Sequence, residues 1–338
     1  MQKNCIMERI IGIGNALVDV LVRLKDEQVL AQLGLPKGGM TLINDSQQCE
    51  LTKLIADFQP TRATGGSAGN AMLALANMGA TPGFIGCVGN DEVGQFFRDN
   101  CNERGIEARL FVTEGYSGVA NTFITPDAER TFATYLGVAG KLKAADITPE
   151  LFQGYQLLHI EGYLVQDCQL IETICRTAKE VGLKTSIDLA SYNVVNENRS
   201  MLRDLVAKYI DIIFANEEES AAFTEGMSPE DALQDIASIA EVAVVKLGKH
   251  GAMAMGNGQQ VRVPGSSLPV VDTTAAGDFF AGGFLYAYTQ GATLERCLEM
   301  GALLAGNIIQ VVGTRLPETR WQEIRRQADE ILNDKYNK

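Results

Sequence analysis

The stretch Asp272-Thr273-Thr274-Ala275-Ala276-Gly277-Asp278 leads from an extended segment through small residues into a helix predicted over Gly277–Tyr288. Small residues let an anion approach the backbone closely, and the first N–H groups of a helix have no intrahelical acceptors. The amides of residues 275–277 are therefore predicted to form an anion site. Asp278 beside it would suit a general base for an alcohol that attacks a phosphoryl group. The alternative is an acidic first turn that only stabilises its helix.

Outward from this stretch, short apolar runs alternate with longer amphipathic segments. The predicted strands are Ile10–Ile13, Phe84–Val88, Leu157–Ile160, Thr185–Leu189, Ile210–Ala215 and Val242–Leu247. The predicted helices are Ala68–Met78, Glu92–Arg104, Leu170–Glu180, Arg199–Ala207, Pro229–Ile239, Gly277–Tyr288, Leu294–Val311 and Glu318–Leu332. This alternation predicts an α/β fold with a doubly wound, mostly parallel sheet flanked by helices. We expect residues 1–338 to form a single domain.

Two segments, 16–43 and 108–137, interrupt the alternation with the period-two pattern typical of half-buried strands. Strands from separate regions of a chain can pair in one sheet. Ligands of parallel α/β sheets bind at the carboxyl ends of the strands. We therefore predict that the two segments form a small β lid over that end of the main sheet.

Composition narrows the classes of function. The chain has 29 Lys and Arg against 42 Asp and Glu, and its net charge of −13 disfavours nucleic acids and anionic membranes as partners. No segment approaches the about 18 consecutive apolar residues of a membrane span. Seven scattered cysteines without a Cys-x-x-Cys pair indicate reduced thiols. We expect a cytoplasmic monomer or homodimer that acts on a small molecule, with Met1 or Met7 as its first residue.

A second glycine-rich stretch, Gly65-Gly66-Ser67-Ala68-Gly69-Asn70, opens a predicted helix. Glycine and serine let the backbone approach a ligand, and the Asn70 amide adds donors and an acceptor. The alternative is a glycine-rich helix start without a ligand.

The same stretch matches Gly-x-Ser-x-Gly, the nucleophile elbow of α/β-hydrolases. In that interpretation Ser67 is the nucleophile and His159 or His250 is the base. An elbow requires a buried strand directly before it, and residues 57–64 are polar and contain proline. The pattern therefore gives the hydrolase little support, although it stays an alternative.

Three further signals involve polar residues at or after strands. Asp19 in an apolar run needs a partner or a cleft, and it could accept hydrogen bonds from two sugar hydroxyls or face solvent on a lid strand. Asn216 and Glu219 follow a buried strand and could organise Mg²⁺ and its waters, or only cap a helix. The turn Lys246-Leu247-Gly248-Lys249-His250-Gly251 gives a nucleotide room to approach, or is an ordinary hairpin.

Taken in order, these signals resemble the PfkB-type carbohydrate and nucleoside kinases of the ribokinase-like fold. Two signatures carry the resemblance: Gly65–Gly94, which ends Gly86-Cys87-Val88-Gly89-Asn90-Asp91-Glu92-Val93-Gly94, and Asp272–Asp278. The resemblance covers essentially the whole chain and implies a kinase that uses ATP and Mg²⁺. It also implies that Asp278 is the catalytic base and that the preceding turn is the anion hole. The family usually has Gly where Ala275 stands, but the N–H group is retained.

The resemblance implies roles for further residues. Those expected to bind the sugar or ribose are Asn15, Asp19, Gly66, Ser67, Asn70 and Tyr163. Those expected to hold ATP are Asn216, Glu219, Lys246, Gly248, Gly251 and Asn307, with Glu219 reaching Mg²⁺ through water. Arg130 resembles the lid arginine that reaches the phosphates. Asp272 and Thr274 lie where many members bind a monovalent cation, which would be K⁺.

Within the family, adenosine-kinase-like members are the most similar. Gly65-Gly66-Ser67 replaces the Gly-Gly-Lys common in ribokinases. Tyr163 and Tyr192 could stack on a base or only contribute packing. We therefore expect a nucleoside kinase that favours adenosine. The alternatives are a kinase for ribose, fructose or 2-keto-3-deoxygluconate, the serine hydrolase, and a sensor without catalysis.

Overall fold

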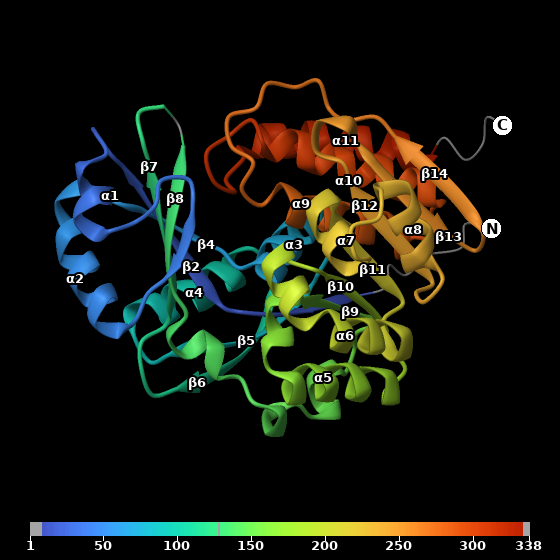
Figure 1. The fold of residues 1–338 in the computed structure, drawn as a ribbon, viewed down its shortest axis with the longest axis horizontal. Helices are drawn as coiled ribbons and strands as arrows, with labels where there is room; N and C mark the ends of the chain where they lie inside the picture. The colour runs from blue at the N-terminus through green and yellow to red at the C-terminus, as the bar shows by residue number, and fades with distance from the viewer. Residues whose placement is uncertain (1–8, 128, 334–338) are drawn as a thin grey trace.

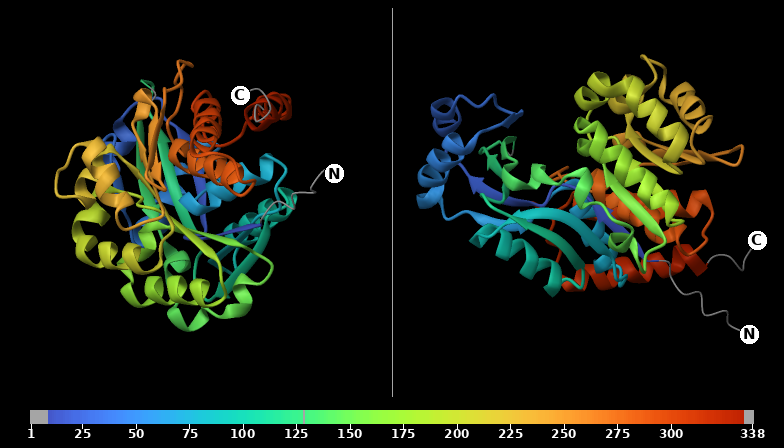
Figure 2. Two further views of the ribbon diagram at one scale, coloured as in Figure 1. Left: turned by 90° about the vertical axis from the view of Figure 1, so that its right-hand side faces the viewer. Right: turned by 90° about the horizontal axis from the view of Figure 1, so that it is seen from below.

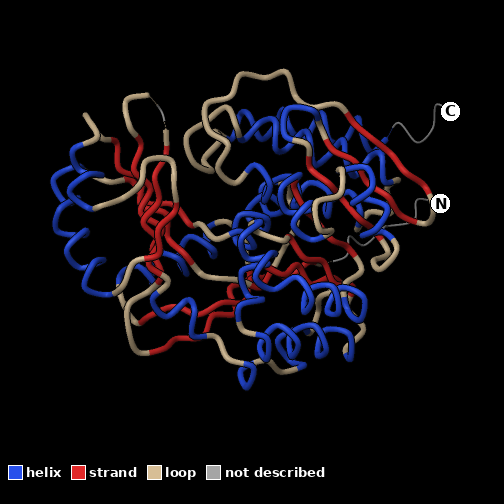
Figure 3. Tube along the Cα trace, viewed as in Figure 1, coloured by secondary structure: helices blue, strands red, loops and turns tan. Residues whose placement is uncertain are grey.

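The computed structural model describes residues 9–127 and 129–333, so Cys5 and the alternative start at Met7 lie outside the described residues. Its main element is a nine-stranded sheet (Figures 1 and 3). The spatial order is β14 (Gln259–Val263), β13 (Ala252–Gly256), β12 (Val242–Lys246), β11 (Ile212–Asn216), β10 (Lys184–Asp188), β9 (Leu157–Glu161), β1 (Ile10–Ile13), β5 (Gly83–Gly89) and β6 (Glu107–Thr113). The seven strands from β12 to β6 are parallel, whereas β13 pairs antiparallel with both β12 and β14.

Helices cover both faces of this sheet (Figure 1). One face holds α3 (Ser67–Asn77), α4 (Glu92–Glu103), α9 (Ala276–Tyr288), α10 (Leu294–Ile308) and α11 (Glu318–Asn333). The other holds α5 (Cys168–Glu180), α6 (Tyr192–Tyr209), α7 (Glu217–Phe223) and α8 (Pro229–Ala237). Along β11, Ile212 and Phe214 join the first core while Ile213 and Ala215 join the second. Burial on both faces explains why these strands are uninterrupted apolar runs in the sequence.

A second sheet of five strands lies to one side of the large sheet, on the left in Figure 1. Its order is β3 (Met40–Leu42), β8 (Arg130–Tyr135), β7 (Gly118–Ile124), β2 (Leu17–Arg23) and β4 (Thr61–Thr64). Two helices, α1 (Gln28–Leu33) and α2 (Asp45–Ile55), lie at its outer side. The view from below in Figure 2 shows this part projecting away from the helix-covered body. Strands from both ends of the first 135 residues therefore pair in one sheet.

The α/β fold and the doubly wound, mostly parallel sheet are confirmed. The boundaries predicted for the lid differ from the structure in two places. The segment 108–137 begins within β6, which pairs in parallel with β5 at the edge of the large sheet. The segment 57–64 contains β4, which pairs antiparallel with β2 in the small sheet. Its polar composition hid this strand, because an exposed edge strand has little apolar alternation.

Short 3₁₀ helices occupy several connections. They span Ala56–Phe58, Gly137–Lys141, Ala144–Asp146, Pro149–Phe152, Gly162–Gln166 and Gly248–His250. Among the described residues, none of the helices has the length and apolar character needed to span a bilayer.

Candidate active site

Asp278 lies in the first turn of α9, directly against the first turn of α3. Ser67 Oγ donates a hydrogen bond of 2.7 Å to Asp278 Oδ1, and Asn70 Nδ2 donates one of 2.9 Å to Asp278 Oδ2. The two helices approach closely because Gly282 has no side chain. A Cβ at that position would lie 2.7 Å from the Cβ of Ala74 on α3. The two glycine-rich stretches singled out in the sequence therefore meet at one carboxylate.

The environment of Asp278 raises its pKa from 3.8 to about 6. Burial is the main cause, since it penalises the charged form, and the charge of Asp188 acts in the same direction. The hydrogen bonds from Asn70 and Ser67, together with the positive charge of Lys246, oppose the increase. A carboxylate with this pKa is ionised at neutral pH and still basic enough to accept a proton.

The turn before Asp278 has the form expected of an anion site. Ala275 adopts a left-handed conformation, with φ 60° and ψ 4°, and α9 begins at the next residue. The N–H group of Ala276 donates to the carbonyl of Thr273 at 3.2 Å, so it is engaged within the turn. This bond favours the amides of Ala275 and Gly277 over that of Ala276 as anion donors, and the role of the three amides stays a prediction.

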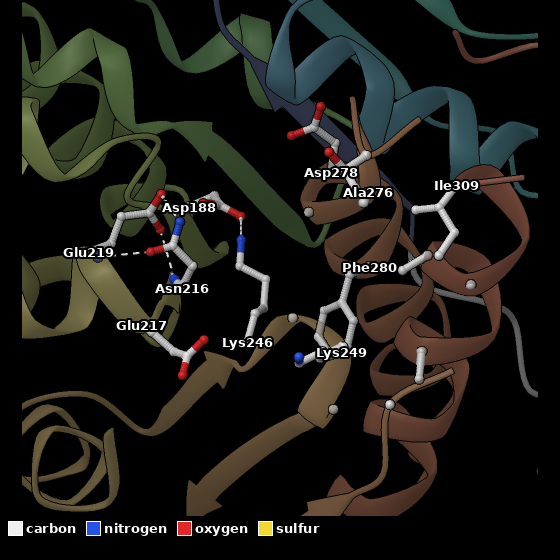
Figure 4. A pocket seen from close by; sticks show the side chains of 18 of the residues that line it. Asp188, Asn216, Glu217, Glu219, Lys246, Lys249, Ala276, Asp278, Phe280 and Ile309 are labelled. Carbon is white, nitrogen blue, oxygen red and sulfur yellow. Dashed lines mark hydrogen bonds and ion pairs between the residues drawn. The ribbon is translucent and has the colours of Figure 1, made fainter. Parts of the chain in front are cut away.

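A pocket of about 760 Å³ opens beside this turn. Ten of the residues predicted for the site line it: Ser67, Tyr163, Asn216, Glu219, Lys246, Gly248, Gly251, Ala276, Gly277 and Asp278. Figure 4 shows Asp278 and Ala276 on one side of it and Asn216, Glu219 and Lys246 on the other. Apolar residues from α9, α10 and the loop before α9 form another wall: Val270, Phe280, Ala302, Ala305 and Ile309. The pocket thus joins a polar end to an apolar end.

The polar end is built from the carboxyl ends of neighbouring parallel strands. Asp188 is the last residue of β10 and Lys246 the last of β12. Their side chains form an ion pair of 2.6 Å and are 6% and 13% exposed. A Cβ on Gly277 would lie 3.2 Å from Lys246 Nζ, so the ammonium group also stands next to the anion turn. Burial lowers the pKa of Lys246, but Asp188 and Glu219 outweigh it and the net pKa is raised.

Asn216 and Glu219 form a reciprocal cap at the start of α7. Asn216 Nδ2 donates to Glu219 Oε1, the Asn216 N–H donates to Glu219 Oε2, and the Glu219 N–H donates to Asn216 Oδ1, each at 2.8 Å. The capping alternative is thus realised, and both residues also line the pocket. Glu219 is 3% exposed, and burial raises its pKa to about 7. One pair of residues therefore caps the helix and lines the cavity.

Asp19 and Asn15 lie on the side of the small sheet. A Cβ on Gly65 would lie 2.3 Å from Asp19 Oδ1, so this carboxylate rests on the glycine-rich stretch. Burial raises the pKa of Asp19 to about 7, and the charge of Asp278 adds to the increase. Asn15 Nδ2 donates to Glu161 Oε1 at 2.6 Å, and burial raises the pKa of Glu161 to about 7 as well. Three acidic groups therefore surround the start of α3: Asp19, Glu161 and Asp278. Of these three, Asp278 lines the pocket, whereas Asp19 and Glu161 do not.

Arg130, at the start of β8, meets the residues predicted to bind K⁺. Its Nη2 forms an ion pair of 2.5 Å with Asp272 Oδ2, and its Nη1 donates to Thr274 Oγ1 at 2.7 Å. The backbone N–H groups of Thr274 and Gly313 donate to the two oxygens of Asp272 at 2.9 and 2.8 Å. Both oxygens of Asp272 are therefore occupied by donors, and these residues do not fit a K⁺ site.

Other predicted residues have different surroundings. Asn307 is not among the residues that line the pocket, and its Nδ2 donates to the Leu303 carbonyl of its own helix at 2.8 Å. A Cβ on Gly251 would lie 2.0 Å from the carbonyl oxygen of Val263, so the backbone at the end of β14 leaves no room for a side chain at this position. Gly66 has φ 82° and contacts the Asn15 carbonyl in the same way. Tyr192 is 47% exposed and lines a separate surface hollow.

The geometry does not support the hydrolase. Ser67 donates to an acid, and β4, which precedes it, is an exposed strand of the small sheet. His159 is buried in β9, where its Nδ1 lies 2.9 Å from Ser186 Oγ and burial lowers its pKa to about 4. His250 belongs to a 3₁₀ turn after β12. Ser67 therefore lacks the hydrogen-bonded histidine that a nucleophile elbow uses.

Sequence reasoning missed two acidic residues of the site. Asp188 and Glu161 each end a buried strand, in Thr185-Ser186-Ile187-Asp188 and Leu157-Leu158-His159-Ile160-Glu161. In adjacent parallel strands these residues stand opposite each other. An acid at the carboxyl end of an apolar run is the signal that could have identified both, since that edge of the sheet binds ligands.

Comparisons with known proteins agree with this site. The family model described as pfkB family carbohydrate kinase matches residues 37–321. The crystal structure of adenosine kinase from Sinorhizobium meliloti is 33% identical, with a TM-score of 0.84 over 95% of this chain and 99% of that one. A probable sugar kinase from Rhizobium etli is 32% identical, with a TM-score of 0.85 over 95% and 98%. An adenosine kinase from Schizophyllum commune is 24% identical over 92% of this chain and 97% of its own length.

These matches extend over most of the chain and include the glycine-rich start of α3 and the turn before Asp278. The chain therefore belongs to the pfkB family of carbohydrate kinases, ATP-dependent enzymes that phosphorylate a hydroxyl group.

Proposed function

We propose that this kinase transfers the γ-phosphoryl group of ATP to a primary hydroxyl of a ribose-containing nucleoside, with adenosine as the favoured acceptor. The observation that carries the chemistry is the Asp278 carboxylate, held by Ser67 and Asn70 beside an anion turn. The likeness to the adenosine kinase from Sinorhizobium meliloti supports the nucleoside. Ser67, in place of the lysine common in ribokinases, supports it from the sequence.

On the acceptor side, Asp19 and Asn70 would hold the ribose hydroxyls. The Asp19 carboxylate packs on Gly65, where a side chain would collide with it, and the Asn15 carbonyl packs on Gly66 in the same way. The two glycines therefore let Asp19 and Asn15 lie directly against the start of α3. Tyr163 lines the pocket and is partly buried, which suits a ring that stacks on a base. The small sheet supplies Asp19, so its position would control access to the acceptor site.

The chemical step is an in-line displacement at phosphorus. A bond forms between the acceptor oxygen and the γ-phosphorus, while the bond from that phosphorus to the bridging oxygen breaks and ADP leaves. The proton of the acceptor hydroxyl passes to a carboxylate oxygen of Asp278. The amides of Ala275 and Gly277 and the ammonium group of Lys246 would stabilise charge on the transferring group. A contact from Arg130 to the phosphates stays a prediction.

On the donor side, Gly248 and the apolar wall formed by Phe280, Ala302 and Ile309 leave space for a nucleotide. Mg²⁺ prefers oxygen ligands, and Asn216 and Glu219, whose side chains carry oxygen atoms, line the pocket. Among the described residues no cluster of three metal-ligating side chains exists, which fits an ion held mostly by phosphate oxygens and water. Asn216 and Glu219 would hold Mg²⁺ through water, where the ion neutralises charge on the phosphates.

A sugar kinase of the same fold is the second candidate, since the probable sugar kinase from Rhizobium etli is about as similar as the adenosine kinase. ADP release with adenosine, other nucleosides, ribose, fructose and 2-keto-3-deoxygluconate separates the two. Adenosine should give the highest kcat/KM, and Tyr163→Leu should lower kcat/KM for adenosine more than for ribose. Turnover with sugars alone would contradict the nucleoside assignment and retain the kinase.

A further inference from the structure

We infer that the guanidinium group of Arg130 takes the place of the monovalent cation expected at Asp272 and Thr274, so that this kinase works without K⁺. The resemblance places a K⁺ site at these two residues, and the structure places a side-chain cation on both. The inference rests on the proposed function for one of its two tests, the measurement of ADP release; the measurement of Tm does not depend on that function.

The contacts leave no oxygen of this pair without a donor. Asp272 Oδ2 forms an ion pair with Arg130 Nη2 at 2.5 Å and accepts a hydrogen bond from the Gly313 N–H at 2.8 Å. Asp272 Oδ1 receives the Thr274 N–H at 2.9 Å, and Thr274 Oγ1 receives Arg130 Nη1 at 2.7 Å. The Asp272 side chain is only 1% exposed. An ion at this carboxylate would compete with Arg130 for Asp272 Oδ2 and for Thr274 Oγ1.

The charged groups around Asp272 also disfavour a K⁺ ion there. Asp272 and Arg130 balance each other, and Asp19 is the other acid whose charge acts on Arg130. Arg23 adds a second positive charge nearby. A K⁺ ion at Asp272 would face two guanidinium groups of like charge in a site that is shielded from water, where such repulsion is strong. The negative charge of Asp272 is therefore neutralised by Arg130.

The guanidinium group of Arg130 is attached to β8, so unlike a free ion it links the small sheet to the turn before α9. Asp272 and Thr274 begin the turn that leads to Ala275 and Asp278, whereas Arg130 belongs to β8 of the small sheet. Strand β8 reaches the turn across 144 residues of sequence. The geometry of the anion turn is therefore tied to the position of the small sheet, and the two should move together.

The experiment compares salts at constant ionic strength. ADP release and the Tm of the ligand-free protein are measured in choline, sodium and potassium chloride, for the wild type and for Arg130→Ala. The wild type should show the same rate and the same Tm in all three. Arg130→Ala should be slow in choline, and K⁺ or added guanidinium ion should restore its rate at least about tenfold, as expected of linked sites. The same cations should raise its Tm.

Arg23→Ala is the matched control, because it removes a nearby cation that does not contact Asp272. It should behave as the wild type in every salt. Activation of the wild type by K⁺ with a rise in Tm would overturn the inference. So would an Arg130→Ala variant that no cation restores, since Arg130 would then act on the phosphates alone. If no acceptor releases ADP in any salt, the proposed function fails, while the Tm comparison still decides the inference.

Discussion

Ser67 and Asp278 are joined by a hydrogen bond of 2.7 Å although 211 residues separate them in the sequence. The hydroxyl donates to Oδ1 of the acid, and Asn70 occupies Oδ2. Hydrogen bonds to a carboxylate stabilise its charged form. The start of α3 therefore fixes the orientation of the proposed base and limits how far burial raises its pKa.

The pH dependence of activity should report this relationship. Proton acceptance requires the carboxylate form, so kcat/KM should fall as the pH drops through about 6, the pKa of Asp278. Ser67→Ala removes a hydrogen bond that lowers this pKa, so its acidic limb should move to higher pH. ADP release measured between pH 5 and 8 checks both curves. An acidic limb that stays in place or moves to lower pH in Ser67→Ala would contradict the arrangement.

The backbone of Ala275 gives a stability prediction. A left-handed conformation costs a residue with a side chain about 1–2 kcal/mol, and glycine avoids that cost while losing more entropy on folding. Ala275→Gly should therefore increase the free energy of unfolding by up to about 1 kcal/mol. The neighbouring Ala276→Gly, which starts α9 without a positive φ, should decrease it. Urea unfolding of both variants decides this, and equal effects would show that the conformation of Ala275 is not strained.

The buried pair Asp188–Lys246 should behave as a unit. Removing one partner leaves an uncompensated buried charge, which typically costs about 3–5 kcal/mol. Lys246→Met should approach that loss, because Asp188 and Glu219 would both lose their cation. The double variant Asp188→Leu/Lys246→Met should lose much less than the two single variants together. Additive losses in a double-mutant cycle on the unfolding free energy would mean that the two charges do not interact.

Stability should also depend on pH through Glu161. Its folded pKa of about 7 lies above the ordinary 4.5, so the folded state binds a proton that the unfolded state releases between these values. The stabilisation is therefore complete below pH 4.5 and is lost as the pH rises through about 7. At about 1.4 kcal/mol per unit of pKa difference, the loss is at most about 3.5 kcal/mol.

Urea unfolding of the wild type at pH 5 and pH 8 measures the combined loss from Glu161 and the other buried acids, Asp19, Glu219 and Asp278, and a variant of Glu161 isolates its share. Glu161→Gln keeps the shape of the side chain without the charge, so its unfolding free energy should change less between the two pH values than that of the wild type. Glu50→Gln, an exposed residue of α2, should follow the wild type. The assignment is wrong if Glu161→Gln and the wild type lose the same stability.

Much of the large sheet was predictable from the sequence because its strands are buried on both faces. The run Val242–Leu247 differs from β12 by one residue, and Ile10–Ile13 coincides with β1. The polar strand β4 was not identified, and β6 was predicted as a strand of the small sheet although it pairs in the large one, since exposed strands carry a weak apolar pattern. Apolar periodicity identifies a strand only where other elements bury one or both of its faces, so it fails for exposed strands at the edge of a sheet.

Those parts of the site that are formed by residues close together in the sequence were predictable. The turn before Asp278 and the cap of Asn216 on Glu219 are local, and both were found. The ion pair between Arg130 and Asp272 joins two distant segments, so no pattern along the chain could reveal it. The carboxylate predicted to bind K⁺ is neutralised by a contact that only the folded chain brings about.

The most direct test of the account is ADP release from ATP and adenosine by the wild type and by Asp278→Asn. A general base typically contributes about 10²–10⁴-fold, so the variant should lose that much of kcat while ATP binding and Tm remain close to wild type. This result would place proton transfer at Asp278. Adenosine-dependent turnover that is unchanged in Asp278→Asn would contradict the central claim.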